Sequence, residues 1–369
     1  MSRIKAGALK SHEPIRIGFV PSTDSAALIY AKESGLFEQQ GLEVELKREI
    51  TWSGIGDKLI NGELDAAQAP APLPFLANLE VDSDPSALVS AMVTSSQGSA
   101  ITISRRLWGE GVQSPGNLLD LIRQGWGRRT RTFGVPSRYS TQNFLLEKWL
   151  RSGGIDSRTQ IRVIAVPAEH MYATLKLGYI DGYCAPEPWN SLAVQAGEGV
   201  CVATSPELLP MRPETVLVVR QSFATGASDK HHAIIRVMME SCSFADQREN
   251  RPVLAEILSQ SGYVNAPHSC LAAGLEGTFS FGYERTGAGP ELIFNRNNVN
   301  KPTDENARWL MQQVYEALNL DESQRRSRER PPILKNVFRR DIFERALEAG
   351  EPKMERSEIS AEAVPMLAR

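Results

Sequence analysis

GELDAAQAPAP, at residues 62–72, returns about 116 residues later as GYIDGYCAPEP, at residues 178–188. The glycine, the aspartate, one alanine and both prolines stand in register. The same offset appears upstream, where GFVPS at residues 18–22 corresponds to GVPS at residues 134–137 with one residue deleted. A shared offset at both ends of a unit predicts a duplicated α/β element. Two similar lobes of this kind form a cleft between them, which is typical of proteins that bind small molecules.

The bulk composition is that of an ordinary globular protein with room for two lobes. The chain has 369 residues, of which 41% are hydrophobic and 23% charged, and its formal net charge is −3. No global basic field favours nucleic acid, and no run of about 18 apolar residues predicts a membrane span. The first 12 residues lack the apolar segment and cleavage site of a secretory signal, so we expect a cytoplasmic protein. A periplasmic location is the alternative if a signal has been removed.

Metal ligands and catalytic groups are sparse. The four cysteines show no CxxC spacing and stand apart from histidine, so we expect reduced, buried thiols and no metal centre. His231 and His232 are interpreted as a solvated helix start. We find no Ser-His-Asp or Cys-His set, with His170 the only histidine of the second lobe, and therefore expect no enzyme.

Hydrophobic periodicity and helix-stop residues give both units a βαβαβ pattern, which predicts parallel sheets. In the first unit we expect strands at 15–20, 42–46 and 64–69, with helices at 25–34 and 52–60. In the second we expect strands at 132–135, 161–166 and 180–185, with helices at 139–151 and 168–177.

Two β-rich segments, at 100–104 and 216–220, are interpreted as a hinge that leaves and re-enters the first lobe. We therefore place the first lobe at 14–104 and 216–320, the second lobe at 105–215 and a C-terminal extension at 321–369. In the extension, a basic, proline-stopped linker precedes a helix at 333–349. Its apolar positions are Leu334, Val337, Phe338, Ile342 and Leu347. Two alternatives stay open for this helix, packing on the body and docking of a partner.

Several motifs resemble one known family. TWSGIGDKL at 51–59, running into GELDAA, and APEPW at 185–189 carry most of the likeness. Weaker matches are QGSAIT at 97–102, PETVL at 213–217 and WL at 149–150. Together they resemble the nitrate- and bicarbonate-binding proteins of ABC transporters. They resemble more closely the cytoplasmic nitrate/nitrite sensors that sequester an RNA-binding ANTAR antiterminator. Over residues 14–320 the resemblance implies a bilobal fold of the periplasmic-binding-protein type II class.

The resemblance also implies a set of ligand contacts. They are Trp52, Gly54, Ser99 (or Gln97 if the alignment slips), Gln142, Thr215 and Glu187. Independently of the family, Trp52 opens a helix, whose first N–H groups favour an anion. For Trp52 the alternative is a core side chain, and for Ser99 an ordinary polar residue of the hinge.

At two of the implied ligand contacts, this chain has a different residue from the nitrate-binding proteins. Gln142 stands where those proteins have a histidine, and Thr215 where they have a lysine. The bicarbonate branch tends to have a glutamine there, with a carboxylate and bound calcium, and Glu214 and Glu187 are candidates for that carboxylate. Nitrate or nitrite remains the first expected ligand. We expect no cofactor, except calcium if the ligand is bicarbonate.

Two non-catalytic functions follow from the resemblance. The first is a cytoplasmic sensor that closes around nitrate or nitrite and controls an ANTAR-type antiterminator. The alternative is a substrate-binding protein that delivers nitrate or bicarbonate to an ABC permease. Direct RNA binding by the basic run at 325–330 is not expected, because it lacks interleaved aromatic residues.

Overall fold

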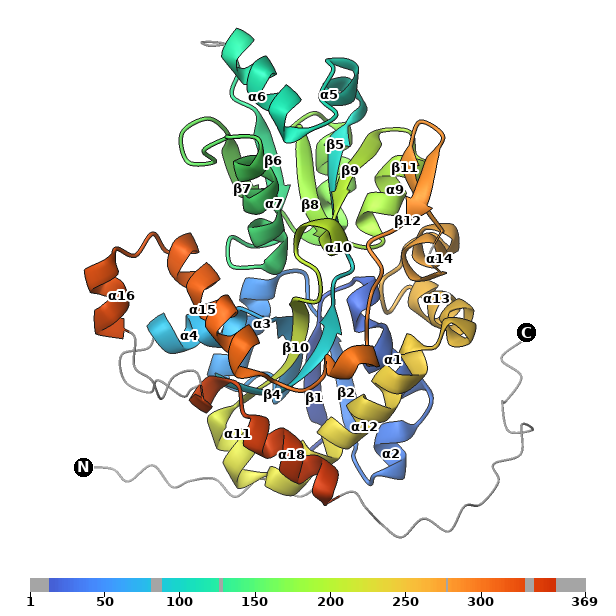
Figure 1. The fold of residues 1–369 in the computed structure, drawn as a ribbon. Helices are drawn as coiled ribbons and strands as arrows, with labels where there is room; N and C mark the ends of the chain where they lie inside the picture. Colours follow the sequence, from blue (N-terminus) through green and yellow to red (C-terminus); the bar gives the residue numbers. More distant parts are fainter. Residues whose placement is uncertain (1–12, 81–87, 126–128, 277, 329–334, 350–369) are drawn as a thin grey trace.

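The computed structural model describes residues 13–80, 88–125, 129–276, 278–328 and 335–349. Its strands form two five-stranded sheets and one two-stranded hairpin. Each large sheet is the centre of one lobe (Figure 1). The expected α/β architecture with two lobes is confirmed.

The first sheet lies in the lower lobe of Figure 1, and its strand order is β2-β1-β3-β10-β4. Its strands are β1 (Ile15–Phe19), β2 (Val44–Arg48), β3 (Ala66–Pro70), β4 (Leu88–Ser96) and β10 (Pro213–Arg220). The second sheet lies in the upper lobe, in the order β7-β6-β8-β5-β9. Its strands are β5 (Ser99–Ser104), β6 (Thr132–Val135), β7 (Arg162–Ala165), β8 (Gly182–Pro186) and β9 (Gly199–Thr204).

Both sheets are mixed, which corrects the expectation of two parallel sheets. β1 pairs in parallel with β2 and β3, and β6 with β7 and β8, as the βαβ pattern predicts. In contrast, β10 is antiparallel to β3 and β4, and β5 is antiparallel to β8 and β9. The reason is that β5 and β10 arrive from the other lobe and not through a helical crossover.

The chain passes between the lobes at points different from those expected. β4 ends at Ser96 in the first sheet and β5 begins at Ser99 in the second, so Gln97 and Gly98 form the first crossing. Gly98 has φ of +88°, and a Cβ there would lie 2.3 Å from Leu292 Cδ1, so the crossing requires glycine. Residues 99–104 therefore belong to the second lobe. The return crossing precedes β10, at 209–212.

The hairpin of β11 and β12 packs against the second lobe, although residues 216–320 were assigned to the first. Phe279 is buried in a cluster with side chains of β5, α9 and β9. Arg285 Nη2 donates to Cys201 O at 2.9 Å. The hairpin lies outside both copies of the repeat, so no pattern in the sequence predicts this return. Its strands are β11 (Thr278–Gly282) and β12 (Arg285–Ala288).

Helices surround both sheets (Figure 1). The first lobe has η1 (Thr23–Ser25), α1 (Ala26–Glu33), α2 (Leu36–Gln39), α3 (Trp52–Asn61), α4 (Leu73–Glu80), α11 (Gln221–Gly226) and α12 (Ser228–Asp246). The second has α5 (Arg105–Gly109), α6 (Pro115–Gln124), α7 (Thr141–Ser152), η2 (Ala168–His170), α8 (Met171–Lys176), α9 (Trp189–Gln195) and α10 (Ser205–Leu208). The later helices are η3 (Arg248–Asn250), α13 (Arg251–Ser259), α14 (His268–Glu276), η4 (Arg296–Asn298), α15 (Asp304–Ala317), α16 (Glu322–Arg328) and α18 (Arg340–Glu348). Within the described ranges, no helix is long and apolar enough to cross a lipid bilayer.

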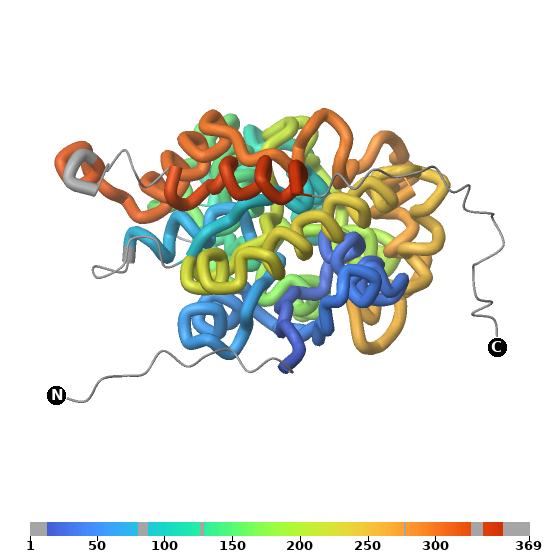
Figure 2. The backbone as a smooth tube through the Cα atoms, turned by 90° about the horizontal axis from the view of Figure 1, so that it is seen from below, coloured from blue at the N-terminus to red at the C-terminus, as the bar shows by residue number. Residues whose placement is uncertain are grey.

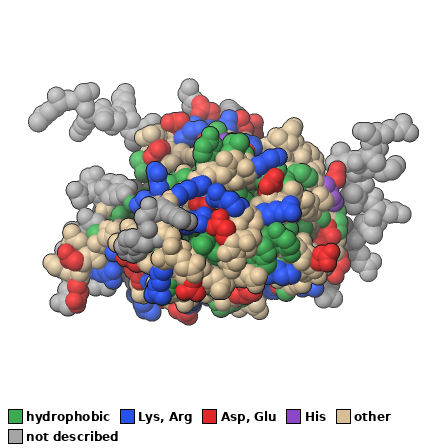
Figure 3. Space-filling model, turned by 90° about the horizontal axis from the view of Figure 1, so that it is seen from above, with side chains coloured by type: hydrophobic (Ala, Val, Ile, Leu, Met, Phe, Trp, Pro, Cys, Tyr) green, Lys and Arg blue, Asp and Glu red, His purple; other side chains and the backbone are tan. Residues whose placement is uncertain are grey.

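Two apolar clusters sandwich the first sheet. One contains side chains of α1 and α12, and the other contains side chains of α3, α4 and α15. A third cluster fills the second lobe between its sheet and α6 and α7. On the face of the molecule seen from above, basic and acidic side chains are interspersed, and neither sign covers it (Figure 3).

The C-terminal helix α18 packs on the first lobe against α12 and β4 (Figure 2). Ile342, Phe343 and Ala346 are buried, whereas Leu347 is 37% exposed, so the apolar face is displaced from the one expected. Leu334 lies outside the described residues. The helix thus follows the alternative in which it packs on the body.

His231 is buried in α12, which corrects the expected solvated helix start. Burial lowers the pKa of His231 to about 3, so the imidazole is neutral at ordinary pH.

Candidate functional site

The loops at the carboxyl ends of the parallel strands face the opposite lobe, which is where α/β sheets bind ligands. Two hydrogen bonds join these loops across the cleft. Thr23 N donates to Glu187 O at 2.8 Å, and Trp189 Nε1 donates to Pro21 O at 3.0 Å. Because Pro21 and Thr23 follow β1 while Glu187 and Trp189 follow β8, the two lobes are closed on each other in this structure.

On the first-lobe side, a buried network joins η1, β3, β4 and β10. Ser95 Oγ donates to Asp24 Oδ1 at 2.8 Å and lies 2.6 Å from Thr215 Oγ1. Gln68 Nε2 donates to Asp24 O at 2.6 Å and to Thr215 Oγ1 at 3.0 Å. All four side chains are buried. Asp24 is therefore held directly by Gln68 of β3 and Ser95 of β4, which Thr215 of β10 joins to each other.

On the second-lobe side, Gln142 connects α7 to β5 and β10. Its Nε2 donates to Ser99 Oγ at 3.1 Å and to Glu214 Oε1. Ser99 N donates in turn to Ser205 Oγ at 3.1 Å. Gln142 belongs to the second lobe and Glu214 lies at the start of β10 in the first sheet. The amide–carboxyl hydrogen bond therefore crosses the cleft, and it brings together three residues that the sequence had singled out.

The cleft is acidic. Burial raises the pKa of Asp24 to about 7, although the hydrogen bonds from Ser95 and Ser22 act to lower it. Burial, followed by the charge of Asp24, raises the pKa of Glu214 well above its usual range. Neither carboxyl forms an ion pair with a described Lys or Arg. At least one of the two carboxyls, that of Asp24 or that of Glu214, is therefore protonated near neutral pH.

Five buried polar atoms of the predicted contacts and of the network around Asp24 have no hydrogen-bond partner among the described residues. They are Trp52 Nε1, Gln68 Oε1, Gln142 Oε1, Glu187 Oε1 and Glu214 Oε2. Buried polar groups are ordinarily paired, so a group of unpaired ones marks a place for a ligand or water. Four of the five are oxygens that accept hydrogen bonds. The arrangement therefore fits a ligand that itself carries a hydrogen-bond donor.

Trp52 opens α3 as expected, and Thr51 caps the helix. Thr51 Oγ1 accepts from Gly54 N at 3.1 Å, so the Gly54 N–H is used by the cap of its own helix. Trp52 is 4% exposed and belongs to a cluster against which Tyr139 of the second lobe packs. Of the two predicted contacts on α3, the geometry leaves the Trp52 indole N–H as the available donor.

The Glu187 carboxyl has a hydrogen-bond partner on α9 through one of its two oxygens. Its Oε2 accepts from Ser191 N at 3.2 Å, and a Cβ on Gly274 of α14 would lie 2.8 Å from Glu187 Cβ. Burial raises the pKa of Glu187 to about 7. The charge that acts on Glu214 is that of Asp24. The structure therefore encloses the Glu187 side chain between α9 and α14 and does not pair it with Glu214.

Gln97, the alternative to Ser99, lies at the crossing outside this network. Its amide faces Met211, with 3.5 Å between Nε2 and Sδ, and the flipped amide would donate to Glu291 O. Ser99, the first residue of β5, is the one that contacts Gln142.

The carboxyl groups of the cleft can be compared with the oxygen ligands that a calcium ion needs. The described residues contain no group of three or more His, Cys, Asp or Glu side chains arranged to hold a metal ion. Ca²⁺ takes six to eight oxygen ligands in proteins, as a rule. Asp24 and Glu214 would supply two carboxyls, so a calcium ion here would depend on oxygens of the ligand and of water.

Sequence reasoning missed Asp24, Gln68 and Ser95. It interpreted PSTD at residues 21–24 as helix-capping residues, although the run follows a parallel strand at its carboxyl end. Gln68 stood out less, as one polar side chain in the otherwise apolar strand β3. A polar residue in a fully buried strand is the signal that would have found it.

A closed cleft between two α/β lobes, lined by buried amides, hydroxyls and carboxyls, defines a bilobal ligand-binding protein. The chain belongs to the NMT1-like family, which it matches over residues 9–259. The bilobal fold expected from the motifs is confirmed by the two five-stranded sheets of this structure.

Transport proteins are among its relatives. The chain is 33% identical over 302 residues to the bicarbonate transport ATP-binding protein of Synechococcus elongatus, covering 81% of this chain and 44% of that protein. It is 25% identical over 303 residues to the nitrate/nitrite binding protein of Nostoc, covering 80% and 69%. The crystal structure of the periplasmic nitrate-binding protein from Synechocystis matches with a TM-score of 0.84 at 22% identity, covering 92% and 90%.

The chain spans about half the length of the ATP-binding relatives that it matches. The expected likeness to nitrate- and bicarbonate-binding transport proteins is confirmed. Its assignment to the cytoplasmic sensor branch, with an ANTAR-type partner, stays a prediction.

Proposed function

We propose that this chain binds a small planar oxyanion between its lobes without changing it chemically, as the substrate-binding part of an ABC-type importer. We further propose that bicarbonate fits the cleft better than nitrate, which the sequence put first. The observation that carries this choice is the contact of Gln142 with Glu214, since Gln142 Oε1 and Glu214 Oε2 both lack partners.

The chemistry of the two anions separates them. Bicarbonate has a hydroxyl that donates a hydrogen bond, and nitrate has none. A carboxylate oxygen such as Glu214 Oε2 accepts from that hydroxyl, whereas it repels the oxygens of nitrate. The remaining bicarbonate oxygens would accept from the Trp52 indole and from a protonated Asp24. Ser99 holds the Gln142 amide in place, and Thr215 holds Ser95, which donates to Asp24.

Calcium is an alternative way to balance the charge of the cleft. A divalent cation would neutralise Asp24 and Glu214 and attract the anion directly. The unpartnered Glu214 Oε2 is the observation that favours it. Binding with and without calcium separates the two cases.

Two roles for the same cleft differ in their partner. Similarity to the nitrate/nitrite binding protein favours delivery to a permease, in which case the protein works outside the cytoplasmic membrane. Similarity to transport ATP-binding proteins favours a cytoplasmic location, because an ATP-hydrolysing subunit meets the cytoplasm. A ligand-binding chain in the cytoplasm would act as a sensor. Uptake of labelled bicarbonate in cells lacking this chain, with the importer present, distinguishes them: delivery requires the chain, and sensing changes only the regulation of uptake.

A thermal-shift series tests the ligand. A ligand at about 100 times its dissociation constant stabilises the native state by about 2.7 kcal/mol. We expect bicarbonate to raise the melting temperature, and nitrate, nitrite, sulfate and chloride to leave it unchanged, at fixed ionic strength. A shift with nitrate alone would contradict the choice of bicarbonate, and no shift with any anion would contradict the proposed function.

A further inference from the structure

An ion pair joins the two lobes at the side of the cleft that lies away from the crossings. Arg48 is the last residue of β2, and Glu169 lies in η2, which follows β7. Arg48 Nη2 donates to Glu169 Oε2 at 2.6 Å. β2 and β7 are outer strands of their sheets, and the strands next to the crossings, β4, β5, β9 and β10, lie at the opposite edges. The pair therefore spans the lip of the cleft, where a hinge motion separates the lobes most.

Arg48 is also fixed on the first lobe independently of Glu169. Its Nε donates to Tyr263 O at 2.8 Å, and in β2 it pairs with Phe19, the last residue of β1. The side chains of Arg48 and Glu169 are 29% and 17% exposed, so solvent screens this contact less than a surface ion pair. When the lobes separate, Glu169 leaves with the second lobe and Arg48 stays at the edge of the acidic cleft.

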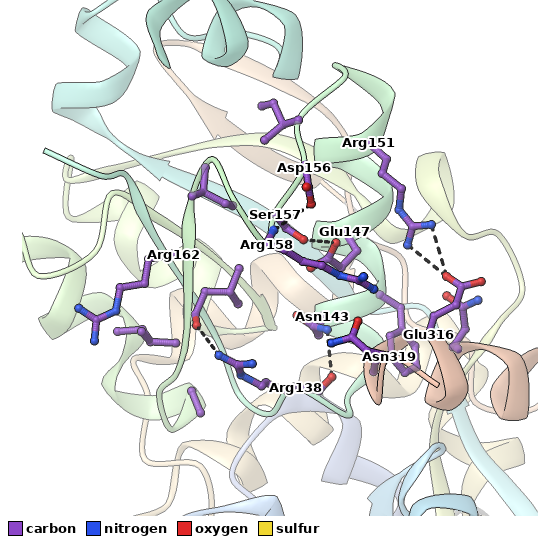
Figure 4. Close-up of a pocket in the computed structure, with 18 of the residues that line it drawn as sticks. Arg138, Asn143, Glu147, Arg151, Asp156, Ser157, Arg158, Arg162, Glu316 and Asn319 are labelled. Carbon is purple, nitrogen blue, oxygen red and sulfur yellow. Dashed lines mark hydrogen bonds and ion pairs between the residues drawn. The ribbon is translucent and has the colours of Figure 1, made fainter. Parts of the chain in front are cut away.

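A second ion pair between the lobes is more exposed. Arg151 of α7 contacts Glu316 of α15 at 3.3 Å (Figure 4), and the Arg151 side chain is 60% exposed. Exposed pairs of this kind contribute little free energy as a rule. This pair therefore offers a comparison in which one interlobe charge is lost without the partly buried contact at the lip.

We propose that Arg48 and Glu169 form a latch, which holds the lobes closed and slows the release of the bound anion. The pair forms only when the lobes meet, so its free energy favours the closed state alone. In the open state the freed guanidinium of Arg48 attracts an anion to the acidic cleft. Arg48 thus affects both entry and release, whereas Glu169 affects release. The effect on release rests on the proposed function, and the effect on closure does not.

Stopped-flow binding of bicarbonate to the full chain tests this inference at low and at physiological ionic strength. Tryptophan fluorescence follows the reaction, because the indoles of Trp52 and Trp189 lie at the cleft. The variants are Glu169→Gln, Arg48→Gln, the two combined, and Glu316→Gln as the matched control. Each exchange with glutamine removes the charge and keeps a side chain of similar length.

We expect Glu169→Gln to release bicarbonate about fivefold faster or more, with an unchanged association rate, because it loses a hydrogen bond between charged groups. Arg48→Gln should also associate more slowly, most clearly at low ionic strength. The double variant should release bicarbonate no faster than Arg48→Gln, since the two residues act as one contact. Glu316→Gln should behave as the unaltered chain does.

Small-angle scattering of the ligand-free chain separates the latch from the proposed function. Glu169→Gln should have a larger radius of gyration than the unaltered chain. That difference, with no bicarbonate response in any variant, would overturn the proposed function and leave the latch in place. Equal radii and equal release rates for Glu169→Gln and the unaltered chain, or the same changes in Glu316→Gln, would overturn the latch.

Discussion

Asp65 and Asp181, which lie 116 residues apart, perform the same structural role in the two lobes. Asp65 Oδ2 accepts from Arg16 N at 2.9 Å, and Asp181 Oδ2 accepts from Thr132 N at 2.9 Å. The donors are also 116 residues apart. Each carboxylate thus ties the beginning of the last strand of its unit to the first strand. The arginines beside them are Arg16 and Arg220 at Asp65, and Arg106, Arg129 and Arg131 at Asp181.

Asp181→Asn should lower the free energy of unfolding by about 1–3 kcal/mol, because it weakens charge-assisted hydrogen bonds to a fully buried group. Asp65→Asn should have a smaller effect, since its side chain is 13% exposed. Urea unfolding of both variants, with exposed Asp120→Asn as control, measures the difference. Wild-type stability in Asp181→Asn would contradict the shared role.

Gly18 and Gly134 are the second matched pair of the repeat. A Cβ on Gly18 would lie 2.6 Å from Leu64 Cδ1, and one on Gly134 would lie 2.9 Å from Met171 Sδ. We expect Gly18→Ala and Gly134→Ala each to destabilise the fold by about 1–3 kcal/mol through overpacking. Gly109→Ala, where a Cβ meets nothing within 4 Å, is the control for thermal unfolding. Equal melting temperatures for all three would show that the neighbouring side chains yield without strain.

The buried carboxyl of Asp24 makes stability depend on pH. Its folded-state pKa of about 7 lies above that of an unfolded aspartate, so the folded state holds more protons between about pH 4 and about pH 7. Its contribution is therefore lost as pH rises through that window. His231, with a lowered pKa, acts in the opposite direction.

The comparison with Asp24→Asn isolates this contribution. The variant should lose less stability than the unaltered chain between about pH 5 and about pH 8, in urea unfolding without ligand. Parallel profiles for the two proteins would mean that Asp24 titrates in its ordinary range.

The C-terminal helix should contribute to the stability of the first lobe. Phe343 is 5% exposed against α12, so Phe343→Ala should destabilise by about 3–5 kcal/mol. Leu347→Ala, at a partly exposed position of the same helix, should change stability by less than about 1 kcal/mol. If chemical denaturation finds the two variants equal, the helix is not held by this face.

The repeat made the core of both lobes predictable from sequence. Its glycines, aspartates and prolines mark the ends of strands and the positions where the backbone packs closely against a neighbour. Such local features can be recognised from the sequence pattern. β10 and β5 were less predictable, because a strand that crosses from another lobe has the same local pattern as one that stays. The β11–β12 hairpin returns to the second lobe through Phe279, a contact far along the chain that no periodicity encodes.

The candidate site was predicted in part. Gln142, Ser99 and Glu214 meet in the structure; the resemblance had implied the first two as ligand contacts and Glu214 as a candidate carboxylate for calcium. Glu187 was also expected there, but its side chain is enclosed by α9 and α14, an outcome that depends on packing with distant residues. Asp24 was hidden by its short polar run, in which capping and ligand binding look alike.

The most direct test of the central claim is calorimetric titration of bicarbonate and nitrate into the unaltered chain and into Glu214→Gln, with and without calcium. The account predicts that the unaltered chain prefers bicarbonate. It also predicts that Glu214→Gln loses about tenfold or more of that affinity, since the carboxylate that accepts the bicarbonate hydroxyl becomes a neutral amide. Tight binding of nitrate to the unaltered chain, undiminished in Glu214→Gln, would contradict it.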